Sequence, residues 1–230
     1  RAKMLFVNYP NNPTGAVIED DFFTRLTEFG RRHEIAIIHD NAYSEITFDG
    51  YVAPSFLQTL GAREAGIEFY SLSKTYNMTG WRVGAAVGNA EIIEALWRLK
   101  TNVDSGMFQA LQRAAVTAMS GPQDCVSDMC AGYQRRRDLV VTTLRDIGIG
   151  CSCPKGPLYI WVPVPDGGTS APFAVLGLEK AAWGAPVGPG GGRPPGRLPD
   201  LPARSRGTGR GGPSAGPQPR AVAPQTSCTR

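Results

Sequence analysis

Residues 35–43 read Ile-Ala-Ile-Ile-His-Asp-Asn-Ala-Tyr, an apolar run that stops abruptly at charged and polar residues. A short continuous apolar run of this kind is typical of a strand that is buried on both faces. Similar runs occupy 4–7, 67–70 and 83–87. The runs at 4–7, 35–38 and 67–70 are separated by segments long enough for helices. We therefore predict an α/β fold with a largely parallel sheet and helices on both faces.

Helical periodicity supports this interpretation. Between the first two predicted strands, one helical face carries Phe22, Phe23, Leu26 and Phe29. The second half of the chain predicts three helices and then one more strand. The helices are predicted over 90–100, 106–119 and 124–147, and Gly148 is expected to end the last of them. The strand is predicted over 158–162.

The end of the chain has a different composition. Residues 184–230 contain 11 Gly, 10 Pro and 7 Arg, with Asp200 as the one acidic residue. A segment of this kind cannot bury enough apolar surface to offset its chain entropy, so it is predicted to be disordered. The globular part is therefore expected to lie within about residues 1–183.

Charge and composition exclude several classes of protein. The formal net charge is +4, but the tail carries seven of the basic residues and one acid, which leaves 17 basic and 19 acidic residues elsewhere. Net charge therefore gives no reason to expect nucleic-acid binding. No apolar run reaches membrane-spanning length and no signal peptide opens the chain. Five Cys without metal-ligand spacing and two His argue against zinc and favour a reduced, cytoplasmic setting.

Polar residues with complementary chemistry follow the predicted strands. In open α/β sheets, ligands bind beyond the carboxyl ends of the strands. A lysine there, such as Lys74, can form a Schiff base, and a carboxylate such as Asp40 can hold a pyridine nitrogen protonated. A phenol and an amide suit a ring hydroxyl, while serines and an arginine suit a phosphate. The remaining candidates are Asn12, Tyr43, Ser71, Ser73 and Arg82.

Each of these residues has an ordinary structural explanation when taken alone. Asp40 could cap a helix, Lys74 could be a solvated surface charge and Tyr43 a half-buried packing residue. Arg82 could pair with a surface acid. Their joint occurrence at successive strand ends favours a binding site for a carbonyl-bearing, phosphorylated cofactor. His39, beside Asp40, is tempting as a general base, but its position favours packing.

Four motifs carry a resemblance to a known family. They are Asn11-Asn12-Pro13-Thr14-Gly15, Asp40-Asn41-Ala42-Tyr43, Ser71-Leu72-Ser73-Lys74 and Gly80-Trp81-Arg82-Val83-Gly84. Together they resemble the class I/II aminotransferases, which are fold-type I pyridoxal-phosphate enzymes, over about residues 4–180. Within the family, the segments 40–50, 71–84 and 101–112 are most similar to bacterial LL-diaminopimelate aminotransferases.

The resemblance implies a role for each candidate. Lys74 would be the catalytic residue, bonding the cofactor and moving the substrate's α-proton, and Asp40 would pair with the ring nitrogen. Tyr43 and Asn12 would contact the phenolic oxygen, and Ser71, Ser73 and Arg82 would hold the phosphate. The substrates would be an amino acid and a 2-oxo acid, and no metal is implied. Family members form homodimers, with 101–109 expected near the partner subunit.

The resemblance also predicts the domains of the chain and shows two places where the chain departs from the family pattern. Residues 1–120 would be a partial large cofactor-binding domain and 121–180 part of a small α+β domain. The family's upstream half, with an aromatic residue stacked on the cofactor, precedes Arg1, so we expect a fragment. Residues 181–230 abandon the family pattern before the strand whose arginine grips the substrate carboxylate. We expect a shifted reading frame near residue 181, with a genuine disordered tail as the alternative.

Two other functions remain open at the level of sequence. Cofactor motifs do not separate an aminotransferase from a lyase or decarboxylase on the same fold. An aminotransferase-like regulatory domain that senses the cofactor is a third possibility, which an upstream helix-turn-helix would support. Because the carboxylate-binding arginine and the upstream half are absent, we expect this polypeptide alone to be poorly active.

Overall fold

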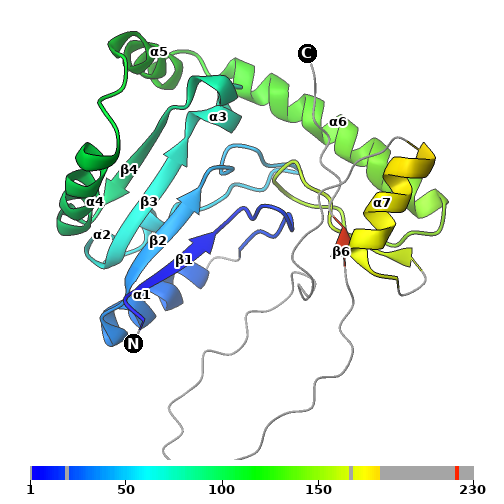
Figure 1. Ribbon diagram of the computed structural model, residues 1–230, viewed down its shortest axis with the longest axis horizontal. Helices are drawn as coiled ribbons and strands as arrows, with labels where there is room; N and C mark the ends of the chain where they lie inside the picture. Colours follow the sequence, from blue (N-terminus) through cyan, green and yellow to red (C-terminus); the bar gives the residue numbers. More distant parts are fainter. Residues whose placement is uncertain (1, 19–20, 166–167, 182–220, 223–230) are drawn as a thin grey trace, which may run out of the picture.

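A four-stranded sheet forms the centre of the molecule in the computed structural model (Figure 1), which describes residues 2–18, 21–165, 168–181 and 221–222. The strands are β1 (Met4–Asn8), β2 (Ala36–Asn41), β3 (Gly66–Ser71) and β4 (Gly84–Gly88), in that spatial order. β1, β2 and β3 run parallel, and β4 is antiparallel to β3. The predicted α/β class with a largely parallel sheet is confirmed.

The antiparallel strand β4 follows from a short connection. Residues 72–83 hold only α3 (Leu72–Thr75) and the 3₁₀ helix η2 (Thr79–Trp81), so they contain no long crossover helix. The backbone N–H of Leu72 donates to the carbonyl of Val83 at 3.1 Å and closes this loop. The chain therefore turns back at the end of β3, and a strand that turns back beside its neighbour pairs with it antiparallel.

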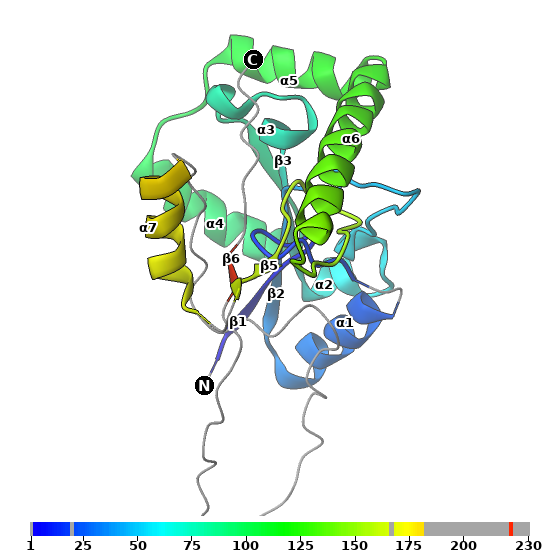
Figure 2. The same cartoon turned by 90° about the vertical axis from the view of Figure 1, so that its right-hand side faces the viewer.

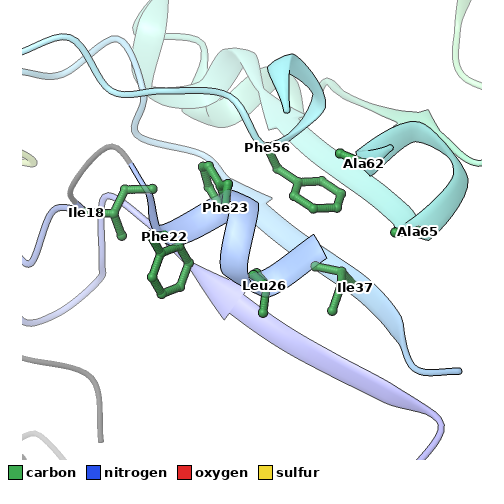
Figure 3. Close-up of a cluster of buried hydrophobic side chains, with 8 residues drawn as sticks. All are labelled: Ile18, Phe22, Phe23, Leu26, Ile37, Phe56, Ala62 and Ala65. Atoms are coloured by element: carbon green, nitrogen blue, oxygen red, sulfur yellow. The ribbon is translucent and has the colours of Figure 1, made fainter. Parts of the chain in front are cut away.

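One face of the sheet is covered by α1 (Phe22–His33), the 3₁₀ helix η1 (Phe56–Gln58) and α2 (Ala62–Ala65). Their apolar side chains meet Ile37 of β2 in one core cluster, seen in Figure 3. The predicted apolar face of α1 is confirmed at Phe22, Phe23 and Leu26, which are all buried. Phe29, at the edge of this face, instead packs its ring on His33 with the centroids 4.6 Å apart.

The opposite face is covered less completely. α4 (Ala90–Val103) lies on that side, away from α1 and α2 (Figure 2), and contacts β3 and β4. On β1, the side chains of Met4 and Phe6 are 57% and 67% exposed. The face beside β1 therefore presents apolar side chains that a larger domain would be expected to bury.

The later elements follow the predicted order, with two corrections. The predicted helices are α5 (Gln109–Ser120), which begins three residues later than expected, and α6 (Asp124–Asp146). A further helix, α7 (Ser170–Ala181), follows them and had no predicted range. The strand predicted over 158–162 is wrong for most of its length, because only β5 (Val162–Pro163) forms. Tyr159, Ile160 and Val162 of this run are buried, but no long neighbouring strand pairs with it in the described residues.

The end of α6 agrees with the sequence pattern. Gly148 has a φ of +83°, and its N–H donates to the carbonyl of Arg145. The next N–H, that of Ile149, reaches back to Leu144. A left-handed glycine that lets the chain bond back to the last turn is a common way for a helix to end.

Most of the Gly/Pro/Arg-rich tail lies outside the described residues. The prediction that it is disordered therefore concerns residues that the structure does not describe. Two of its residues form β6 (Ala221–Val222), which pairs antiparallel with β5. The expected domain boundaries at 120 and 180 stay a prediction. Within the described ranges, no helix combines the length and apolar character needed to cross a membrane.

Candidate functional site

The candidate site lies at the carboxyl edge of the sheet, where β1, β2 and β3 end. The register places Asn8 of β1 beside Asp40 of β2, and Asp40 beside Phe69 of β3. Asp40 and Ser71 were expected just beyond their strands, but both belong to the strands themselves. The paired backbone therefore fixes their positions directly.

The Asn-Pro-Thr-Gly stretch forms a turn organised by side-chain amides. The side chain of Asn8 donates from Nδ2 to the backbone carbonyl of Asp40 at 2.9 Å, and its Oδ1 accepts from the N–H of Asn12. Asn11 Oδ1 accepts from the backbone N–H and the hydroxyl of Thr14. Asn and Asp commonly stabilise turns in this way. The turn is thereby tied to β2 and presents Asn12 at the site.

Tyr43 lies at the centre of the candidate site. It occupies the turn after β2, and its hydroxyl accepts a hydrogen bond from Asn12 Nδ2 at 3.3 Å. The ammonium nitrogen of Lys74, on α3, lies 5.9 Å from the centroid of the Tyr43 ring. The fold therefore brings together three of the predicted residues from three different segments of the chain.

A fourth residue, Tyr159, joins this group, although the sequence pattern indicated only a strand at this position. Its hydroxyl oxygen lies 2.6 Å from that of Tyr43, and the two rings meet edge to face. Both side chains are buried. Burial raises the pKa of Tyr43, and it also raises that of Tyr159. Both are therefore protonated phenols at neutral pH.

The predicted phosphate ligands Ser71, Ser73 and Arg82 lie around the end of β3 and the loop that follows it. The Ser71 hydroxyl accepts from the backbone N–H of Ser73 at 3.2 Å, and Ser73 is itself buried. Arg82 is exposed, has a φ of +55° and donates from Nη1 to the carbonyl of Thr79 at 3.2 Å. The structure gives no hydrogen bond between Arg82 and either serine in the described residues, so their grouping around one phosphate stays a prediction.

His39 packs behind the site, as predicted. It is fully buried, and its two ring nitrogens lie 2.8 Å from Glu68 Oε2 and 2.9 Å from the carbonyl oxygen of Tyr9. Glu68 also accepts from Asn41, from the Ser55 hydroxyl and from the backbone N–H of Phe56. His39 is therefore engaged in a core network on the face of the sheet opposite to the side chain of Asp40.

The network determines the charge of Glu68. Burial by itself raises the pKa of this carboxyl, but the hydrogen bond from His39, the charge of His39 and the bonds from Asn41 and Ser55 outweigh it. The pKa of Glu68 is therefore below its ordinary value. A carboxylate that accepts several hydrogen bonds is stabilised in its ionised form.

The segment that carries Tyr159 is fixed at three points. Arg137 on α6 is buried, forms two hydrogen bonds to Asp49 at 2.6 and 3.0 Å, and donates to the carbonyl of Pro154. The N–H of Phe48 donates to the carbonyl of Lys155 at 2.8 Å. The third point is Gly15, where an added Cβ would lie only 2.9 Å from the carbonyl oxygen of Tyr159.

Within the part of the chain that the structure describes, no three His, Cys, Asp or Glu side chains gather where they could hold a metal ion. The helical pattern over 124–147 suggested no role beyond the core for Cys125 and Cys130, which is wrong for Cys125 because its thiol is exposed. Cys130 makes a hydrogen bond to the carbonyl of Glu45, and Cys125 is a free, exposed thiol.

Comparison with known proteins supports the interpretation of these motifs. Residues 1–181 match the family described as aminotransferase class I and II. LL-diaminopimelate aminotransferases from Desulforudis audaxviator and Dehalococcoides mccartyi are each 57% identical over 192 residues, which is 84% of this chain and 48% and 49% of theirs. The chain therefore spans about half the length of these curated relatives.

A solved structure gives the same result for the fold. The apo structure of BacF from Bacillus subtilis superimposes with a TM-score of 0.76 at 40% identity, over 80% of this chain and 49% of that one. The family match also ends where the composition changes, at the last residue of α7. The chain belongs to the class I and II aminotransferases.

Proposed function

We propose that the full-length protein carrying this chain is a pyridoxal-phosphate-dependent aminotransferase that moves an amino group between LL-diaminopimelate and 2-oxoglutarate. The observation that carries the proposal is the convergence of Asn12, Tyr43 and Lys74, from three segments, at the edge where β2 and β3 end. The substrate rests on the relatives at 57% identity, which are LL-diaminopimelate aminotransferases.

The side chains present have the chemistry that this cofactor requires. Lys74 offers an amine for the cofactor's aldehyde, and Asp40 offers an exposed carboxylate on the neighbouring strand for its ring nitrogen. Tyr43 and Asn12 suit the phenolic oxygen, and the amide and phenol are already in contact. Ser71, Ser73 and Arg82 supply neutral and charged donors for a phosphate.

Bound pyridoxal phosphate would supply a protonated ring that takes up the electron pair released at the α-carbon of the amino acid. The chain's own residues would then have separate tasks. Asp40 would hold the proton on the ring nitrogen by its negative charge. The Lys74 amine would take the proton from the α-carbon of the substrate and deliver it to carbon C4′ of the cofactor. Tyr43 and Asn12 would hold the cofactor ring in one orientation through its phenolic oxygen.

The proposal is tested by locating the covalent bond and identifying the substrates. The full-length protein is loaded with pyridoxal phosphate, reduced with borohydride and digested, and the labelled peptide is found by mass spectrometry. We expect the label on Lys74 and amino transfer from LL-diaminopimelate to 2-oxoglutarate. A label elsewhere contradicts the site, and release of ammonia or carbon dioxide without amino transfer indicates a lyase or a decarboxylase.

The role of Arg82 leads to a separate prediction. If its guanidinium binds the phosphate, Arg82→Ala should raise the dissociation constant of pyridoxal phosphate about 10- to 100-fold, because a charged hydrogen-bonded pair contributes ~1.5–3 kcal/mol. Binding of pyridoxal, which lacks the phosphate, should change little. The matched control is Arg98→Ala on α4, whose guanidinium contacts Glu94. Equal weakening of both vitamers would show that Arg82 does not bind the phosphate.

We also propose a homodimer for the full-length protein. The resemblance puts residues 101–109 near a partner subunit, and this segment exposes large apolar side chains, with Val103 74% and Phe108 72% exposed. Sedimentation of the full-length protein tests this, and a monomer would contradict it. A cytoplasmic location, and the expectation that the present chain alone is poorly active, stay predictions.

A further inference from the structure

The hydrogen bond between Tyr43 and Tyr159 joins a proposed cofactor ligand to a residue from a distant part of the chain. The two hydroxyl oxygens are 2.6 Å apart, although the residues are 116 positions apart in the sequence. One hydroxyl must donate and the other accept. The direction of this bond decides what the Tyr43 proton can do.

The surroundings favour donation from Tyr159 to Tyr43. The Tyr43 oxygen already accepts from the Asn12 amide nitrogen, which can only donate. Among the described residues, Tyr43 is the hydrogen-bond partner that the structure gives the buried Tyr159 hydroxyl. If Tyr43 donated instead, the buried proton of Tyr159 would be left without an acceptor, which is unfavourable.

We propose that Tyr159 is a positioning residue that donates to the Tyr43 oxygen and so leaves the Tyr43 proton to be donated to the phenolic oxygen of the cofactor. With two donors, Asn12 and Tyr159, both lone pairs of the Tyr43 oxygen are occupied. A phenol that accepts hydrogen bonds also becomes a stronger donor, because the bonds polarise one another. The inference rests on the proposed function, since it concerns the same cofactor.

The fold holds Tyr159 where this role requires it. Gly15 packs against its backbone carbonyl, and the bonds from Arg137 to Pro154 and from Phe48 to Lys155 fix the segment that precedes it. Tyr159 is therefore presented to Tyr43 by the turn that also carries Asn12. The positions of both donors to Tyr43 depend on one local structure.

The test uses the full-length protein loaded with pyridoxal phosphate and follows its visible absorbance against pH. The absorbance changes when the Lys74 nitrogen bonded to the cofactor loses its proton. A donor to the phenolic oxygen withdraws negative charge from that oxygen and so weakens its hold on this proton. Tyr43→Phe should therefore raise the pH midpoint. Tyr159→Phe should raise it in the same direction by a smaller amount, roughly half a pH unit.

The double variant separates a positioning role from a merely structural one. If Tyr159 acts through Tyr43, Tyr159→Phe should add nothing to the midpoint of the Tyr43→Phe variant. The matched control is Tyr51→Phe, which removes a tyrosine hydroxyl that donates to the carbonyl of Ile18. This control should leave the midpoint unchanged. Additive shifts, or no shift with Tyr159→Phe, would overturn the inference.

A second measurement keeps the inference testable if Tyr159→Phe does not fold. Incorporation of 3,5-difluorotyrosine at position 159 retains the ring and makes its hydroxyl a stronger donor, so the midpoint should move downward. An unchanged or raised midpoint would again contradict the inference. Failure of the unsubstituted protein to bind the cofactor at Lys74 would instead contradict the proposed function, so the two failures are distinguishable.

Discussion

Replacing Lys74 with alanine is expected to lower kcat for amino transfer at least about a thousandfold in the full-length protein. The alanine methyl can neither bond the cofactor nor take up the α-proton, and a positioned proton-transfer group is worth roughly a hundred- to ten-thousandfold. Lys74 is the amine placed near the Tyr43 ring, 5.9 Å from its centroid. Steady-state kinetics at saturating substrate and cofactor measure the effect.

The same variant should still bind the cofactor, although without the covalent bond. Asp40, Tyr43 and Arg82 remain, so the expected defect lies in kcat more than in occupancy. The matched control is Lys100→Ala, which removes an exposed lysine paired with Asp104. A Lys74→Ala protein that keeps more than a tenth of its activity would show that another group moves the proton.

Replacing Glu68 with glutamine is expected to reduce the free energy of unfolding by about 1–3 kcal/mol, because the amide leaves buried hydrogen-bond donors without a suitable acceptor. His39 would lose its carboxylate partner at 2.8 Å. The bonds from Asn41, Ser55 and the backbone of Phe56 would also weaken. Urea unfolding of the folded full-length protein, compared at one pH, measures the loss.

Glu64 provides the matched control for this prediction. It lies on α2 only four residues from Glu68 but is exposed, so Glu64→Gln makes the same chemical change without a buried partner. We expect a change within ~0.5 kcal/mol for the control. Equal effects of the two substitutions would contradict the role assigned to the buried network.

The pH dependence of stability follows from the lowered pKa of Glu68. A carboxyl with a lower pKa in the folded state adds stability that is fully present above its unfolded value, which is about 4.3 for glutamate. This contribution is lost as the pH falls through the folded pKa. The unsubstituted protein should therefore lose stability below about pH 4 more steeply than Glu68→Gln. Unfolding curves at several pH values measure the difference in slope.

Some features of the fold were predictable because they depend on local patterns. The four apolar runs became strands, although only β2 and β3 are largely buried, and α1 formed where Phe22, Phe23 and Leu26 repeat at helical spacing. The apolar run 158–162 is largely buried, but only its last residue belongs to a strand. A strand needs a partner, and the presence of a partner is not a property of the run itself.

The candidate site likewise contains residues that could be predicted from the sequence and one that could not. The convergence of Asn12, Tyr43 and Lys74 could be predicted from the sequence, because strand ends in a parallel sheet meet at one edge. Tyr159 could not be assigned, because its signal is a buried tyrosine in an apolar run. Only the docking of its segment, through Gly15 and Arg137, brings its hydroxyl to Tyr43.

The sequence by itself determined the α/β class, the order of the four sheet strands and of helices α1, α4, α5 and α6, and the convergence of Asn12, Tyr43 and Lys74. These follow from hydrophobic period and strand direction, which act over a few residues. The tertiary structure alone decided that His39 is held in a buried pair with Glu68, that β4 is antiparallel and that Tyr159 contacts Tyr43. Such contacts depend on the packing of segments far apart in the chain, which no local pattern encodes.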